Sequence, residues 1–265
     1  MFSASLQPPI LSLFSSTGSD PLALWATRTD ASLPADSFVC LLEDSSSTPV
    51  PPPPANLISP LAVEPDSEHG RGEGHILSQT ILHLQSPTLR TTFVQCPSAV
   101  DSALGVKHPW IHLQVRNMGR EWSFEVGVVD RAGREGVIRL STFQKTPRLK
   151  AVLPPILHLP LAFPSQSAHR LTTWSTVSLK LPSLLPRFTD PSLLEEEEGQ
   201  SDEEESPDWA KHPKQARFTG MEPSGLYSHV SYVRVYATCR LRRIWFSETG
   251  QTQEMPWEFE LYSVA

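Results

Sequence analysis

The chain has 265 residues and a formal net charge of −7, and 26 of its residues are proline. Proline at about twice its usual ~5% abundance excludes an architecture of long helices. The chain is long enough to bury a hydrophobic core without stabilising disulfides or metal sites. Three cysteines without a CxxC pair give neither a disulfide framework nor a zinc site, which indicates a reducing compartment.

No segment reads as a targeting or membrane element. The N-terminus lacks a basic region and is interrupted by Pro8 and Pro9, which disfavours a secretory signal. The longest apolar stretch, 151–163, is shorter than a bilayer span and contains three prolines. We therefore expect a soluble intracellular protein with no membrane partner.

Two passages are predicted to be disordered insertions. Residues 37–74 are rich in proline, serine and glycine, and residues 186–226 contain the acidic run 195–205, EEEEGQSDEEE. Neither passage offers enough apolar surface to offset the entropy of ordering it. The acidic run holds eight acidic residues and no basic one, so the rest of the chain has a formal charge of about +1.

Between these passages the sequence predicts short strands. Alternating or β-branched apolar residues mark 76–84, 91–96, 110–116, 122–128, 137–142, 171–181, 233–248 and 257–262. A short helix is predicted in either 182–191 or 97–104. The fold class is therefore all-β: an antiparallel two-sheet β-sandwich of jelly-roll type, forming a single domain over 1–265 with the two insertions.

The stretch 233–248, VRVYATCRLRRIWFSE, has the clearest alternation. One face is predicted to point into the core and consists of Val233, Val235, Ala237, Cys239 and Leu241. The opposite face is polar and consists of Arg234, Tyr236, Thr238, Arg240 and Arg242.

Basic residues suggest a partner-binding patch. The candidate residues are Arg240, Arg242, Arg243, Lys145, Arg148 and Lys150. They form either a docking surface for an acidic protein or a solvated sheet face that pairs with Glu125 or Glu248. Nucleic acid is the less favoured partner, because aromatic residues are not interleaved with the basic ones.

Catalytic and metal-binding motifs are not found in the sequence. It lacks GxSxG, HExxH and GxxxxGK[ST], and its nine histidines show no ligand spacing. Cys96 and Cys239 lie beside apolar strand residues and are predicted to be buried, inert thiols. We expect no enzyme activity, no cofactor, no metal and no small-molecule substrate.

Three further features leave alternatives open. Trp122 and Trp174 are predicted core residues, whereas a carbohydrate-binding sandwich would expose coplanar aromatics. Trp209 lies in the acidic passage and is either a motif anchor or uncommitted. Ser201 and Ser206 are candidate phosphorylation sites beside acidic residues or proline.

Several blocks resemble, in the right order, the cilia- and flagella-associated protein 20 family. They are MFSASLQPPILSLFSSTGSDPLALW, TTFVQCP with LGVKHP, WSFEVGVVD, IRLSTFQKTPRLK, and VRVYATCRLRRIWFSE with MPWEFELY. The resemblance covers about 1–36, 76–185 and 226–264. The two predicted disordered passages are insertions relative to the family pattern.

The resemblance implies a non-enzymatic β-sandwich of the axoneme and basal body. Family members are microtubule-associated, lie at the inner junction between the A- and B-tubules, contact tubulin and neighbouring junction proteins, and influence ciliary beating. Arg240, Arg242 and Arg243 match the basic block of the family, and Arg148 and Lys150 match its basic turn. The insertions would either obstruct a packed lattice site or project from it as tethers.

A second cellular setting is also compatible with the resemblance. Nuclear roles have been ascribed to the family, and without a cilium the chain would be a nuclear or cytoplasmic protein-interaction module. The insertions would then be its docking segments.

Overall fold

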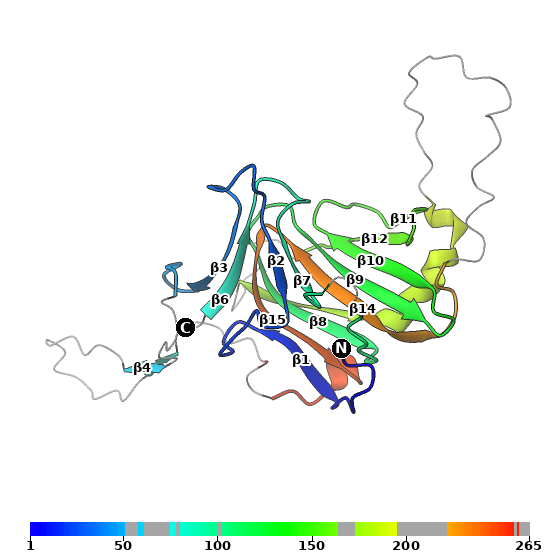
Figure 1. Cartoon of the computed structure of the whole chain (residues 1–265), viewed down its shortest axis with the longest axis horizontal. Coiled ribbons are helices and arrows are strands. Elements are labelled where there is room, and N and C mark those ends of the chain that lie inside the picture. Colours follow the sequence, from blue (N-terminus) through cyan, green and yellow to red (C-terminus); the bar gives the residue numbers. More distant parts are fainter. Residues whose placement is uncertain are drawn as a thin grey trace, which may run out of the picture.

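Two β-sheets pack face to face in this protein (Figure 1). The computed structural model describes residues 1–50, 58–60, 75–77, 80–99, 102–163, 173–194, 222–256 and 259, and for 58–60 and 75–77 it describes the backbone alone. Apolar residues from both sheets meet in one core. The predicted all-β sandwich is therefore confirmed.

Six strands form the first sheet, which we call sheet A. They are β1 (Ile10–Ser15), β3 (Phe38–Glu43), β6 (Thr80–Gln85), β8 (Trp110–Asn117), β13 (Trp174–Lys180) and β15 (Cys239–Ser247). Their order is β13-β8-β15-β6-β3, and β1 also pairs with β15. All of these pairs are antiparallel. β15 is therefore central, because it pairs with three strands.

Seven strands form sheet B. They are β2 (Ala26–Arg28), β7 (Phe93–Cys96), β9 (Ser123–Asp130), β10 (Glu135–Ser141), β11 (Arg148–Lys150), β12 (Ile156–Pro160) and β14 (Tyr227–Tyr236). Their order is β11-β12-β10-β9-β14-β7-β2. One pair, β10 with β12, is parallel and departs from the predicted antiparallel arrangement. It arises because β12 folds back antiparallel to β11 and lies between β11 and β10. β12 therefore runs in the direction of β10.

Smaller elements complete the described chain. β4 (Ile58–Pro60) and β5 (His75–Leu77) form a separate antiparallel pair. The described residues include three 3-10 helices: η1 (Leu181–Thr189), η2 (Pro191–Leu193) and η5 (Gly250–Thr252). η1 confirms the predicted short helix at 182–191, and the proline inside it, Pro186, cannot donate the backbone bond that an α-helix needs. The described part of 97–104 is not helical.

The core contains the apolar residues that the alternation predicts. Trp122 is fully buried and packs beside Phe124, with 6.2 Å between ring centroids. Trp174 is 6% exposed, but it packs in a second, smaller cluster with Leu42 and Ile81, outside the main core. Both predictions of burial are confirmed, so these two tryptophans do not provide the exposed aromatic face of a carbohydrate-binding sandwich.

The stretch 233–248 forms parts of two strands in different sheets. β14 ends in sheet B at Tyr236 and β15 begins in sheet A at Cys239, so the chain crosses between the sheets at Ala237 and Thr238 (orange in Figure 1). The inward alternation continues through the crossing, since all five predicted core residues are at most 1% exposed. The opposite face is divided between the two sheets.

Part of each passage predicted to be disordered is ordered. In 37–74, the apolar run of β3 pairs with β6 along its whole length. In 186–226, η1 ends and η2 follows. The prediction is wrong at these places because sheet A and the core supply partners that local composition does not reveal. The remainder, 51–57, 61–74 and 195–221, and most of the predicted strand 257–262 lie outside the described residues.

Candidate functional site

The arginines of β15 lie in the middle of sheet A. Arg240 is 7% exposed and Arg242 is 4% exposed, whereas Arg243 is half-buried. Long charged side chains are rarely this buried unless they are paired. The structure therefore does not present Arg240 and Arg242 as an exposed patch, and their contact with a partner stays a prediction.

Asp44, in the turn after β3, is the acidic partner of Arg240. The Nη1 atom of Arg240 lies 3.3 Å from Asp44 Oδ1, and its Nη2 atom donates to Ser47 Oγ at 2.7 Å. Arg116 Nη1 is also 3.3 Å from Asp44 Oδ1, and Trp174 Nε1 donates to Oδ2 at 2.8 Å. One carboxylate thus joins this turn to β8, β13 and β15. The predicted pairing with Glu125 or Glu248 is wrong for Arg240.

A β-bulge changes the strand after Arg240. The pairing of β15 with β8 shifts between Leu241 and Arg243, and the Arg242 carbonyl accepts from Ser16 N at 2.9 Å. The Arg243 guanidinium lies 5.0 Å from the ring centroid of Phe259. The bulge thus brings Arg243 against Phe259.

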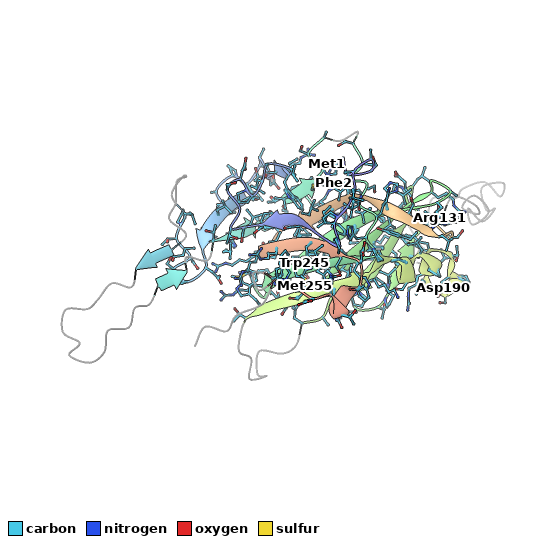
Figure 2. The ribbon with its side chains drawn as sticks, turned by 90° about the horizontal axis from the view of Figure 1, so that it is seen from below. Met1, Phe2, Arg131, Asp190, Trp245 and Met255 are labelled. Carbon is cyan, nitrogen blue, oxygen red and sulfur yellow. The ribbon has the colours of Figure 1, made fainter. Side chains whose placement is uncertain are left out.

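Aromatic rings line the same outer face of sheet A. Trp245, labelled in Figure 2, contacts Phe259 edge to face at 5.2 Å between centroids. On its other side Trp245 stacks on His112 at 4.9 Å, and His112 stacks on Trp110 at 6.3 Å. Phe259 therefore covers part of this face, which explains why an outward tryptophan is only 3% exposed.

The other predicted cations belong to sheet B. Arg148 and Lys150 lie on the edge strand β11, and Lys145 lies in the loop before it. Lys145 and Arg148 are exposed, and Lys150 is half-buried. The six predicted residues are thus divided between the centre of one sheet and the edge of the other. The role of these six residues in partner binding remains a prediction. Ser201, Ser206 and Trp209 lie outside the described residues.

A carboxylate on the outer face of sheet B organises a cluster that the sequence did not predict. Glu125 is 2% exposed, although its neighbours on β9 point into the core. Arg139 donates both Nε, at 2.7 Å, and Nη2 to Glu125 Oε1. Arg234 Nη1 lies 3.4 Å from Oε2, to which Tyr236 and Tyr232 donate their hydroxyls at 3.2 and 3.4 Å. We call these five residues the Glu125 cluster.

Arg234 is held by aromatic rings as well as by charge. Its guanidinium lies 4.8 Å from the Phe93 centroid, 5.2 Å from that of Tyr232 and 5.8 Å from that of Tyr236. Its Nε donates to Gln95 Oε1 at 2.8 Å. Burial and the negative charge of Glu125 raise the pKa of both tyrosines, so their hydroxyls remain donors at neutral pH. Alternation placed Glu125 and Arg234 outward, but it could not give the register that joins them.

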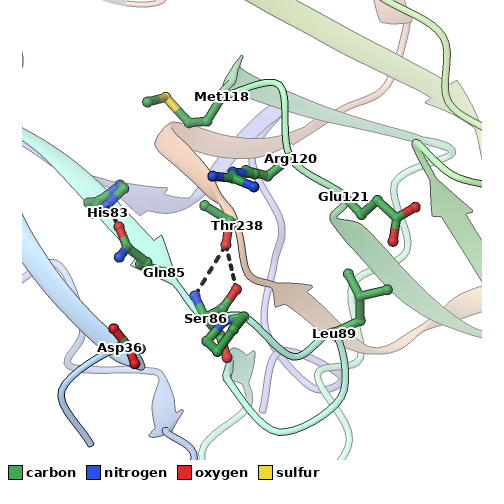
Figure 3. Close-up of a pocket in the computed structure, with 10 residues that line it drawn as sticks. Asp36, His83, Gln85, Ser86, Leu89, Met118, Arg120, Glu121 and Thr238 are labelled. Atoms are coloured by element: carbon green, nitrogen blue, oxygen red, sulfur yellow. Dashed lines mark hydrogen bonds between the residues drawn. The ribbon is translucent and has the colours of Figure 1, made fainter. Parts of the chain in front are cut away.

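A cavity of about 560 Å³ lies where connections from both sheets meet (Figure 3). Its charged lining residues, Asp36, Arg120 and Glu121, are all exposed. Thr238, at the crossing between the sheets, accepts a bond from Ser86 N at 3.1 Å and donates one to Ser86 O at 3.0 Å. The hydroxyl of Thr238 therefore fixes the β6–β7 connection against the crossing.

Burial favours the neutral forms of His112, Cys96 and Cys239. The ring nitrogens of His112 lie 2.8 Å from the hydroxyls of Ser178 and Ser247, and burial lowers the pKa of His112 to about 4. Burial raises the pKa of Cys96 to about 12 and also raises that of Cys239. Both thiols are fully buried, which confirms the predicted burial.

Neither a metal-binding cluster nor a membrane-spanning helix is present among the described ranges of residues. In these ranges, three or more His, Cys, Asp or Glu side chains never come together in a way that could hold a metal ion. Likewise, a helix of the length and apolarity that crossing a membrane requires is missing from the part of the chain that the structure describes.

Comparison with known proteins finds a matching domain model and several similar proteins. The CFA20 domain model matches residues 68–190, which include β8, β9 and β10. Cilia- and flagella-associated protein 20 of Chlamydomonas reinhardtii is 25% identical over 187 residues, covering 70% of this chain and 75% of that protein. The protein of that name from Caenorhabditis elegans is 22% identical over 263 residues, covering 99% and 91%. The one from Paramecium tetraurelia is 22% identical over 187 residues, covering 70% and 75%. Residues 68–190 therefore match the CFA20 domain, and the chain is similar along most of its length to cilia- and flagella-associated protein 20 of several species.

Proposed function

We propose that this protein is a non-catalytic, microtubule-associated structural component of the axoneme and basal body. In this role it would link A- and B-tubules at the inner junction, beside neighbouring axonemal proteins, and influence ciliary motility. The observation that carries the proposal is the similarity to a cilia- and flagella-associated protein along 99% of the chain.

The division of the predicted cations suggests which of them would meet tubulin. Tubulin presents an acidic surface, so accessible basic side chains are the suitable contacts. Lys145 and Arg148 are exposed at the edge of sheet B, whereas Arg240 and Arg242 are buried in sheet A. We assign the contact to the first pair and a stabilising role to Arg240, which pairs with Asp44.

Co-sedimentation with stabilised microtubules tests the proposal. We expect the wild type to pellet at low salt, and we expect the Lys145→Glu/Arg148→Glu variant to bind about tenfold more weakly because two attractions become repulsions. The matched control is Lys180→Glu/Arg187→Glu, which makes the same charge change at exposed positions of β13 and η1. Alanine substitutions at Arg240 and Arg242 are unsuitable, because they would remove buried side chains and destabilise the fold.

Two results would contradict the proposal. Absence of pelleting by the wild type at low salt would exclude direct microtubule binding. A functional tagged protein that is confined to the nucleus of ciliated cells would favour the nuclear interaction module instead.

A further inference from the structure

The register of sheet B places three arginines in a single row across its outer face. Paired residues of neighbouring strands share a face, so the row can be followed from edge to edge through six successive pairs. From β11 to β2 the row consists of Arg148, His158, Arg139, Glu125, Arg234, Gln95 and Ala26. We call it the arginine row.

The row faces away from the core. Its members alternate along their strands with core residues such as Leu149, Leu140 and Val235. The side chains of Arg139 and Arg234 keep 29% and 27% of their surface exposed, and Arg148 is exposed. Glu125, by contrast, is only 2% exposed beneath its partners. Guanidinium groups and aromatic rings, not the carboxylate, therefore form the accessible surface.

The guanidinium groups are held in place before any partner arrives. Glu125 takes two of the five N–H groups of Arg139, and within the described residues the other three have no acceptor. Arg234 is fixed by Gln95, Tyr236 and the rings beneath it. Fixed side chains lose less entropy on binding, and arginine with tyrosine is the composition typical of interface hot spots.

The spacing of the arginines suits an extended chain. Successive arginines are two strands apart, which is about 10 Å at the ~4.8 Å spacing of strands in a sheet. An extended peptide advances about 3.3 Å per residue, so every third residue would meet an arginine. The exposed Arg28 lies beside the row, opposite Phe93 on the same face. The row itself carries three positive charges and one shielded negative charge.

Nucleic acid fits this face less well than an acidic peptide. Single-strand readers need open aromatic faces on which bases stack. Here the guanidinium of Arg234 already lies over the rings of Phe93, Tyr232 and Tyr236. Glu135, exposed on the same face of β10, would add repulsion toward phosphates.

We propose that the arginine row on the outer face of sheet B binds an extended acidic segment of a partner polypeptide. The proposal rests on the proposed function for its choice of an acidic protein as partner. It adds the face, the contacting residues and the extended conformation of the segment.

The test is a titration of the full chain with a fluorescein-labelled polyglutamate peptide of about 12 residues, followed by fluorescence anisotropy at low salt. The variant Arg28→Glu/Arg148→Glu changes exposed residues at both ends of the face, and urea unfolding verifies that it folds. We expect it to bind the peptide at least about tenfold more weakly than the wild type, and Lys180→Glu/Arg187→Glu to bind within about twofold. Arg139→Lys keeps the positive charge but loses the planar guanidinium and its fixed N–H donors, so it should weaken peptide binding about threefold.

Several outcomes would overturn the assignment. These are no binding by the wild type, equal weakening by the two charge-reversed pairs, or tighter binding of an oligouridine of the same length. A further variant replaces the acidic residues of 195–205 by amides. Tighter polyglutamate binding by this variant would show that the acidic run competes for the arginine row, and it would support recognition of acidic peptides by that row. Peptide binding without microtubule pelleting would contradict the proposed function and leave the inference about the arginine row intact. Pelleting without peptide binding would contradict only the inference about the arginine row.

Discussion

Asp44 and Arg240, 196 residues apart in the sequence, form an ion pair at 3.3 Å that fastens the turn after β3 to the central strand of sheet A. Replacing Asp44 by alanine would remove the carboxylate that pairs with Arg240 and that accepts from the indole N–H of Trp174. We expect the Asp44→Ala variant to lose about 2–4 kcal/mol of unfolding free energy, because the arginine side chain is only 9% exposed. Urea denaturation measures this loss.

The control for Asp44 is Asp20→Ala, which removes an exposed carboxylate from a turn. Such a change should alter stability by less than about 0.5 kcal/mol. Equal losses in the two variants would show that the Asp44 carboxylate does not stabilise the fold.

Gly127 of β9 allows Tyr232 to lie against the sheet. A β-carbon at this position would come within 2.5 Å of the Tyr232 ring and 2.3 Å of Ser231 Oγ. We expect Gly127→Ala to cost about 1–3 kcal/mol and to weaken peptide binding at the arginine row, because Tyr232 would have to leave the Glu125 cluster. Thermal unfolding and the anisotropy titration measure the two effects.

A Tyr232→Ala background separates crowding from other causes. If the ring is the obstacle, the same glycine substitution should cost less stability in that background than in the wild type. An unchanged cost would mean that contact with Tyr232 is not the reason.

His112 gives stability a defined pH dependence. Its pKa is lowered from 6.5 to about 4 by burial, so between these values the unfolded chain binds a proton that the folded chain does not. The stability that neutral His112 provides is fully present above pH 6.5 and is lost as the pH falls toward 4. At pH 5 the loss of unfolding free energy is about 2 kcal/mol. Urea unfolding at pH 8 and pH 5 should show a smaller difference for His112→Gln than for the wild type.

His83 and His229 provide the background for that comparison. Burial also lowers their pKa values, so part of the pH dependence persists in the variant. Identical differences between pH 8 and pH 5 in the two proteins would exclude His112 as a source.

Period-two alternation predicted which residues are buried but not which strands pair. It placed Val233 and Leu241 in the core correctly, because the inward pattern continues while the chain changes sheets. The crossing itself has no local signal, since Ala237 and Thr238 read as strand residues. The burial of Arg240 depends on Asp44, which lies in a passage whose composition predicts disorder.

The arginine row also depends on strand pairing that the sequence pattern does not predict. Arg139 and Glu125 lie on adjacent strands and alternate outward, as the sequence indicates. Arg234 reaches Glu125 only through the pairing of β9 with β14, two strands about 100 residues apart, whose register contains two irregularities. Long-range register of this kind is set by the whole core and not by either strand alone.

The packing of Phe259 has a practical consequence for reporter fusions. Its ring contacts Arg243 and Trp245, and its carbonyl accepts a hydrogen bond from Gln114. A fluorescent protein inserted shortly after Phe259 would place its bulk beside this contact. Imaging and pull-down reagents that carry a tag beyond Phe259 should therefore include a long spacer, so that the bulk of the tag does not displace the ring from sheet A.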